Sequence, residues 1–153
     1  MESIHEYRVE AIGARGRNGI VNAEGILPAI SFSPPPEFQG EAGRWTPEHL
    51  LVAAVASCFI STFEGMAQTS RLELGSLRLA AEGVLTKQDS GWRFTEIRLR
   101  PNVTLREEED RERAIRLLEK AEKSCLVARS LQCKVTLSPI VKIKEELSVP
   151  AGV

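Results

Sequence analysis

Near the N-terminus, apolar residues come in short runs that glycine-rich turns separate, a pattern that predicts β-strands. The predicted strands cover residues 4–12, 20–23 and 26–31, and the glycine-rich segment 13–19 joins the first two. Short apolar runs around tight turns are typical of β-hairpins. The pattern therefore indicates an antiparallel unit at this end of the chain.

The longest apolar stretch, residues 50–67, places apolar side chains on nearly every face of a predicted helix. Thr46 is a suitable N-cap, Pro47 fits the first helical position, and Glu48 puts negative charge at the positive end of the helix dipole. A helix with this pattern is expected to be buried all round. Because a small domain has difficulty enclosing such a helix alone, we expect a second copy of the chain to cover part of it.

The second half of the chain alternates first with the period of a strand and then with the period of a helix. Pro101 is expected to bend its strand or leave it at a sheet edge. Strand groups and helices mix without βαβ repetition, so the predicted fold class is α+β, in one domain spanning 1–153. The predicted elements are strands at 76–86 and 92–105 around a turn at 88–91, a surface helix at 106–123, a short helix from Ser124, a strand at 133–143, and a frayed polar tail from Lys144.

Composition narrows the class of protein. The 153 residues are 42% hydrophobic and 27% charged, as in soluble globular proteins. The net charge of −1 gives no electrostatic reason to expect binding to nucleic acid or membrane. The first residues lack the features of a signal peptide, and no run reaches the ~18 uninterrupted apolar residues of a membrane-spanning helix. We expect a cytoplasmic protein, in which cysteines more often serve redox chemistry or metal binding than static cross-links.

Cys58, inside the apolar helix, is the first candidate for chemistry. A thiol in apolar surroundings usually behaves as a small inert hydrophobe, because burial raises its pKa. A nucleophilic role therefore requires a cation, and Arg17, in a glycine-flanked turn, is the candidate because arginine stays charged when partly buried. Glu48 could orient this guanidinium through a bidentate contact. Each has a simpler interpretation: Arg17 as an exposed hairpin-tip residue, Glu48 as an acid at a helix start.

The spacing of Glu48 and Cys58 favours a site shared between subunits. The two residues are ten positions apart on one predicted helix, hence roughly 15 Å apart along its axis. One arginine cannot easily contact both within a single chain. It could do so if two copies of the helix pack antiparallel at a dimer interface.

Cys125 is the second candidate. With Ser124 as a cap, its thiol would lie at a helix N-terminus, which favours a thiolate or a good leaving group, although a cysteine there can also simply fill space. Cys133 is interpreted as a bystander. The three cysteines and two histidines lack metal-ligand spacing, and the chain has no glycine-rich phosphate loop, so neither a metal nor a cofactor is predicted.

These residues together resemble the OsmC/Ohr family of osmotically inducible and organic hydroperoxide resistance proteins. The resemblance implies an intertwined α+β homodimer, with antiparallel sheets around a buried central helix and two sites at the interface. It further implies Cys58 as the peroxidatic thiol, Cys125 as the resolving thiol, and Arg17 with Glu48 as the activating pair. The matching segments are residues 16–19, 46–54, 56–59 and 121–125, in the order and spacing of the family.

One position departs from the family pattern. The family commonly has proline after the second cysteine, and this chain has Leu126. Proline would fix the first residue of the following helix, so its replacement is expected to loosen the turn without removing the thiol.

The resemblance favours an antioxidant, stress-response enzyme: a thiol-dependent peroxidase that reduces organic hydroperoxides. Cys58 would attack the peroxide and release an alcohol, and Cys125 would then resolve the sulfenic acid as a disulfide. An external dithiol, in some relatives a lipoylated protein, would restore both thiols. Trp45, Phe59 and Phe63 are the predicted lining of a substrate pocket that prefers alkyl hydroperoxides to hydrogen peroxide.

Two other functions stay open at this point. The first is a dimer of the same fold that binds a small apolar ligand, or senses redox state, without efficient turnover. The second is an interaction protein that uses the proline-rich loop at residues 34–36. Cα atoms of Cys58 and Cys125 within about 7 Å of each other, or brought there by a small movement, would favour the enzyme.

Overall fold

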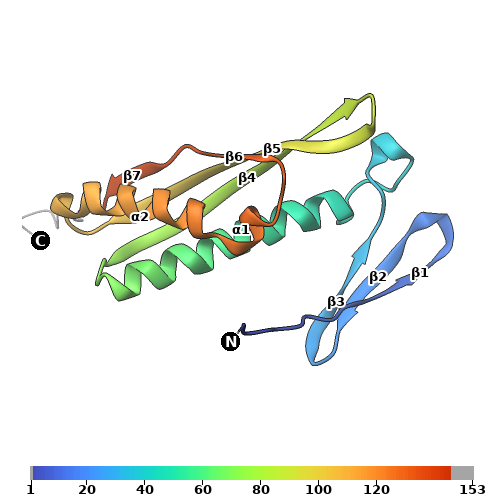
Figure 1. Ribbon diagram of the computed structural model, residues 1–153, viewed down its shortest axis with the longest axis horizontal. Coiled ribbons are helices and arrows are strands. Elements are labelled where there is room, and N and C mark those ends of the chain that lie inside the picture. Colours follow the sequence, from blue (N-terminus) through green and yellow to red (C-terminus); the bar gives the residue numbers. More distant parts are fainter. Residues whose placement is uncertain (1, 146–153) are drawn as a thin grey trace, which may run out of the picture. The chain divides into compact units, whose positions relative to one another are not determined.

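The computed structural model describes residues 2–145, so most of the predicted tail lies outside the described residues. The chain forms two compact units, one up to residue 51 and one from residue 52 onward. The helix α1 (Pro47–Thr69) begins in the first unit and continues into the second. Figure 1 labels the elements of both units.

The first unit contains a three-stranded antiparallel sheet, as predicted. Its strands are β1 (Glu10–Gly13), β2 (Gly19–Ala23) and β3 (Ile26–Phe32), in the order β1-β2-β3, and it also holds two 3-10 turns, η1 (Arg15–Arg17) and η2 (Pro36–Phe38). The first strand is much shorter than the predicted 4–12. Because β2 has only five residues, residues 4–9 find no partner on it and lie outside the sheet.

The second unit is built on a long antiparallel hairpin of β4 (Leu74–Gln88) and β5 (Gly91–Leu105). The predicted last strand at 133–143 is instead two strands, β6 (Lys134–Leu137) and β7 (Ile140–Ile143), and both pair parallel to β5 (Figure 1). The sheet is therefore mixed rather than purely antiparallel. The break falls at Ser138 and Pro139, where proline cannot donate to a ladder.

Pro101 does not lie at a sheet edge, which was one of the two outcomes expected for it, because β5 is paired on both sides. It lies inside β5, fully buried, opposite Leu79 of β4. On the other side of β5, β6 pairs only as far as Leu99 and β7 begins only at Asn102. Proline is thus accommodated where the parallel ladder is already interrupted.

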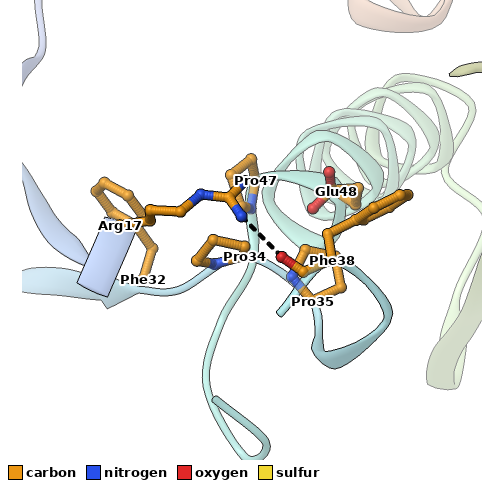
Figure 2. Close-up of a pocket in the computed structure, with 7 residues that line it drawn as sticks. All are labelled: Arg17, Phe32, Pro34, Pro35, Phe38, Pro47 and Glu48. Atoms are coloured by element: carbon orange, nitrogen blue, oxygen red, sulfur yellow. Dashed lines mark hydrogen bonds between the residues drawn. The ribbon is translucent and has the colours of Figure 1, made fainter. Parts of the chain in front are cut away.

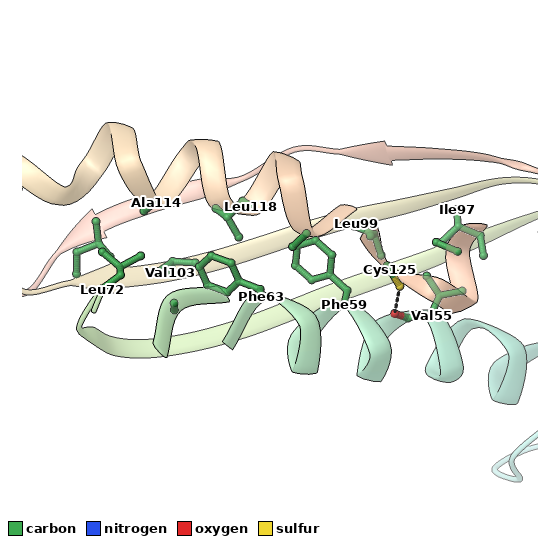
Figure 3. Packing of buried hydrophobic residues seen from close by; sticks show 14 residues of the cluster. Val55, Phe59, Phe63, Leu72, Ile97, Leu99, Val103, Ala114, Leu118 and Cys125 are labelled. Atoms are coloured by element: carbon green, nitrogen blue, oxygen red, sulfur yellow. Dashed lines mark hydrogen bonds between the residues drawn. The ribbon is translucent and has the colours of Figure 1, made fainter. Parts of the chain in front are cut away.

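The helices of the second unit cover one face of its sheet. The helix α2 (Arg111–Ser124) begins later than the predicted 106–123, after the 3-10 turn η3 (Glu108–Asp110), and the short α3 (Leu126–Arg129) follows it. Figure 3 shows the core that they enclose with α1. Its members are buried apolar residues of α1 (Val55, Phe59, Phe63, Ala67), β5 (Ile97, Leu99, Val103, Leu105), α2 (Ala114, Leu118, Ala121), Leu72, Cys125 and Ala128.

The helix α1 is not buried all round in the single chain. Within it, one stripe with i, i+4 spacing is buried, and the remaining positions are half-buried or exposed. By length and composition α1 could also cross a membrane, a property that core helices of soluble proteins share. The observed stripe packs into a protein core, as expected for such a core helix.

Candidate active site

The second unit brings Cys58 and Cys125 together. Cys58 is half-buried on α1, Cys125 is fully buried at the junction of α2 and α3, and both are free thiols. The two side chains are neighbours, and each shifts the pKa of the other. The Cys125 thiol also lies 4.0 Å from the carbonyl oxygen of Val55, three residues before Cys58 (Figure 3). Two thiols in contact are the arrangement that disulfide formation requires.

Hydrogen-bond donors around Cys58 favour its thiolate. Burial is the largest single influence and opposes ionisation, but the donors together outweigh it and lower the pKa of Cys58 below its ordinary value. A thiol with a lowered pKa is the better nucleophile at neutral pH. The donors are the amide of Val127, the thiol of Cys125, the hydroxyl of Thr62 and the amide of Leu126.

The pKa of Cys125 is shifted in the opposite direction. Burial raises it most, and the neighbouring Cys58 raises it further, while the amides of Ala128 and Val127 act against both. The two thiols are therefore inequivalent: Cys125 holds its proton more strongly than Cys58 does. Cys58 is therefore the thiol of the pair that ionises more readily.

The turn between α2 and α3 supplies the amide donors. The helix α2 ends at Ser124, and Cys125 takes an extended backbone conformation (φ −60°, ψ 110°) before α3 begins at Leu126. The backbone of Cys125 is fixed at both ends, because its N–H donates to the Ala121 carbonyl (2.9 Å) and its carbonyl accepts from the Arg129 N–H (3.0 Å). The first amides of a helix have no acceptor within it. Those of Leu126 and Val127 find one in the Cys58 sulfur.

The predicted placement of Cys125 at a helix start is thus confirmed, with one change. Cys125 itself, rather than Ser124, occupies the N-cap position of α3. The amides of this helix start act to lower the pKa of both thiols, but only the pKa of Cys58 falls below its ordinary value.

The first unit places Arg17 and Glu48 on one pocket of about 220 Å³ (Figure 2). Arg17 ends η1 with a left-handed backbone (φ 68°), a conformation that non-glycine residues rarely adopt. Its Nη1 donates to the carbonyl oxygen of Phe38 at 2.9 Å. The other lining residues are Phe32, Pro34, Pro35, Phe38 and Pro47.

Arg17 and Glu48 do not pair directly. Among residues 2–145 no ion pair joins them, so the bidentate contact expected from the sequence is not formed in the single chain. One carboxylate oxygen of Glu48 is buried and accepts no hydrogen bond there. A buried polar atom without a partner is costly, so this carboxylate is suited to receive a donor that the single chain does not supply.

The three residues predicted to line a substrate pocket, Trp45, Phe59 and Phe63, do not line one pocket together. Phe59 and Phe63 are fully buried and stack with their ring centroids 6.4 Å apart, so they form core rather than an open pocket. Each helical residue turns by about 100°, and Phe59 therefore faces the sheet although it follows Cys58 directly. Trp45 is half-exposed and lines a different cavity, of about 280 Å³, with His49.

Two contributions to the site escaped the sequence analysis. Thr62 lies four residues after Cys58 on the same helix, a spacing from which its contact could have been foreseen. The amides of Leu126 and Val127 leave no signal in the residue types. Over the described residues, no group of three or more His, Cys, Asp and Glu side chains gathers as a metal site would require.

Comparisons with known proteins agree with the fold. The profile of the OsmC-like protein family matches residues 40–139, more than half of the chain. The uncharacterized protein YmaD of Bacillus subtilis is 29% identical over 143 residues, which cover 92% of this chain and 95% of YmaD. The peroxiredoxin OsmC of Escherichia coli is 28% identical over 123 residues, 80% of this chain and 85% of that protein.

A solved structure supports the same assignment at the level of the fold. The organic hydroperoxide resistance protein OsmC of Legionella pneumophila superposes with a TM-score of 0.72 at 23% identity, over 92% of this chain and 99% of the other. The long apolar helix and the sheet of each unit thus belong to a known fold. The chain belongs to the OsmC/Ohr family, an α+β family linked to peroxide resistance.

Proposed function

We propose that this protein is a thiol-dependent peroxidase that reduces organic hydroperoxides to alcohols. One observation carries the proposal: a half-buried thiol with a lowered pKa, Cys58, lies beside a fully buried second thiol, Cys125. The names of the relatives, a peroxiredoxin and an organic hydroperoxide resistance protein, point to the same chemistry.

The reaction balances with these two thiols and an external dithiol. The Cys58 thiolate attacks the distal oxygen of the hydroperoxide, the O–O bond breaks, and the alkoxide leaves and takes a proton as an alcohol. The resulting sulfenic acid condenses with the Cys125 thiol, which releases water and forms a disulfide. A dithiol reductant then exchanges with this disulfide, returns both cysteines to thiols and becomes oxidised itself.

Burial and charge assign the order of the two thiols. Cys58 is the more accessible of the pair, so it reacts with the peroxide. Cys125 is fully buried, so it reacts only with the sulfenic acid that forms on Cys58. While Cys58 is ionised, its negative charge opposes loss of the Cys125 proton. Oxidation to a neutral sulfenic acid removes that charge, so Cys125 becomes easier to ionise when it is needed.

We also propose that Arg17 and Glu48 act as an activating pair in a homodimer. Two observations support a second copy of the chain. Large apolar side chains of the first unit are solvent-exposed, among them Ile26 (65%) and Leu27 (91%), and only one stripe of α1 is buried. In the dimer the Arg17 guanidinium would exchange its Phe38 carbonyl for the peroxide or for Glu48.

Peroxide turnover with single-cysteine variants tests the proposed reaction. We expect the protein to reduce cumene hydroperoxide with dihydrolipoamide, and Cys58→Ser to abolish this. Cys125→Ser should permit one oxidation of Cys58 to a sulfenic acid, trapped with dimedone, and then stall. Cys133→Ser is the matched control, and it should leave turnover unchanged. Full turnover in Cys58→Ser would refute the assignment.

The burial of Cys125 also favours a second candidate, a redox sensor that turns over slowly. A dithiol reductant would have to reach the disulfide through the Cys58 sulfur, since Cys125 is 0% exposed. The same assay separates the two functions. Stoichiometric oxidation by the hydroperoxide without catalytic regeneration by dihydrolipoamide identifies the sensor.

A further inference from the structure

The hydroxyl side chains of α1 differ in what they contact. Ser57, Ser61 and Thr69 donate to the carbonyl four residues earlier, at 2.8, 2.9 and 3.0 Å, the usual arrangement for a hydroxyl in a helix. Thr62 does not follow them. Its Oγ1 lies 4.0 Å from the sulfur of Cys58, one turn earlier on the same face.

We propose that Thr62 is a positioning residue for Cys58, an inference that rests on the proposed peroxidase function. Its hydroxyl donates to the Cys58 thiolate and holds the sulfur on the side of α1 that faces Cys125. A hydrogen bond to a charged acceptor is stronger than one between neutral groups, so the contact strengthens when the thiol ionises. A threonine in a helix can place its hydroxyl in either of two rotamers, and here the hydroxyl oxygen lies 4.0 Å from the sulfur.

The surroundings of Cys58 show why Thr62 can be examined separately. The other donors to the sulfur are the Cys125 thiol, which is the titratable group facing it, and the amides of Leu126 and Val127. All three come from the α2–α3 turn. Thr62 comes from α1 itself and is half-buried, so its hydroxyl can be removed without altering the turn that carries the second thiol.

The test is the pH dependence of Cys58 alkylation by iodoacetamide, followed on the Cys58 peptide by mass spectrometry in the reduced full-length protein. Thr62→Val keeps the branched shape and removes the hydroxyl. We expect its alkylation midpoint to rise by about half a pH unit, which slows labelling at neutral pH about threefold. Thr62→Ser restores the hydroxyl and should restore the midpoint.

Thr69→Val is the matched control, because it removes a hydroxyl from the same helix that bonds only to a backbone carbonyl. It should leave the midpoint unchanged. An unchanged midpoint in Thr62→Val, or an equal shift in Thr69→Val, overturns the positioning role. If thermal melting shows that Thr62→Val does not fold, Thr62→Ala makes the same test with a smaller side chain.

This outcome is separable from that of the peroxidase proposal. If the midpoint moves in Thr62→Val while the unmodified protein fails to turn over cumene hydroperoxide, the positioning role stands and the peroxidase proposal fails. If turnover depends on Cys58 but the midpoint does not move, the peroxidase proposal stands and Thr62 has no part in tuning the thiol.

Discussion

The two candidate regions of this protein differ in how complete they are within one chain. In the second unit, the sulfur of Cys58 has its second thiol, a hydroxyl and two backbone amides as partners. In the first unit, the guanidinium of Arg17 binds a backbone carbonyl, and a buried oxygen of Glu48 has no partner among the described residues. The fold of one chain assembles the thiol pair, whereas the charged pair still needs a hydrogen-bond donor for the buried Glu48 oxygen.

This difference separates two tasks that the sequence analysis had combined. Arginine was invoked because a thiol in apolar surroundings needs a cation to ionise. The second unit lowers the pKa of Cys58 with neutral donors, of which the Val127 amide is the strongest. A cation is then required less for ionisation than for the charge that develops on the peroxide oxygens when the O–O bond breaks.

The largest expected effect comes from removing the guanidinium. Arg17→Ala should lower the turnover of cumene hydroperoxide by roughly one to two orders of magnitude, as loss of a charged transition-state donor does. The pH midpoint of Cys58 alkylation should move far less, because its donors belong to the second unit. Measuring both quantities on the same preparation compares the two regions directly.

Arg17→Lys serves as the control for charge. Lysine keeps the positive charge but not the planar fork of donors, and should restore only part of the activity. If Arg17→Ala instead raises the alkylation midpoint by a full pH unit or more, the guanidinium is needed for ionisation and the separation of tasks is wrong.

The sequence allowed prediction of the parts of this molecule that depend on residue type. The start of α1, from Thr46 through Pro47, was predicted from capping preferences, and the buried Thr46 hydroxyl does accept the His49 N–H at 3.1 Å. The hairpin of β4 and β5 followed from alternation and a turn with glycine. Cys58 and Cys125 were identified from their places in an apolar helix and at a predicted helix start, and the family resemblance implied their roles.

The features that were missed depend on backbone geometry or on packing. The N-cap of α3 is Cys125 rather than Ser124, because the extended conformation falls one residue later. Phe59 and Phe63 were placed in a pocket since their apolar character cannot distinguish a core from a cavity lining. The amides that tune Cys58 belong to every residue type except proline, so no sequence pattern marks them.

A smaller effect is expected at Leu126, where the family pattern has proline. Proline has no N–H, so Leu126→Pro removes one of the amides that donate to Cys58. We expect the alkylation midpoint of Cys58 to rise by about half a pH unit. The Leu126 side chain is 70% exposed, and Leu126→Ala, which keeps the amide, should leave the midpoint unchanged. A midpoint that falls in Leu126→Pro would mean that the fixed turn matters more than the lost donor.

The smallest expected effect is on stability, and its sign distinguishes the two thiols. The folded protein lowers the pKa of Cys58, so the stability that this group contributes is present above its unfolded pKa and is lost as the pH falls through the folded value. The folded protein raises the pKa of Cys125. The stability that Cys125 contributes is therefore present below its unfolded pKa and is lost as the pH rises through the folded value.

Urea unfolding of the reduced protein at mildly acidic and at alkaline pH can detect this difference. Relative to the unmodified protein, Cys58→Ser should lose more stability at alkaline pH than at acidic pH, and Cys125→Ser should show the reverse, each by about 0.2 M in the urea midpoint. Cys133→Ser should show no such pH dependence. If Cys58→Ser and Cys125→Ser show the same pH dependence, the two sulfurs hold their protons equally strongly. The order of attack proposed for them would then lose its physical basis.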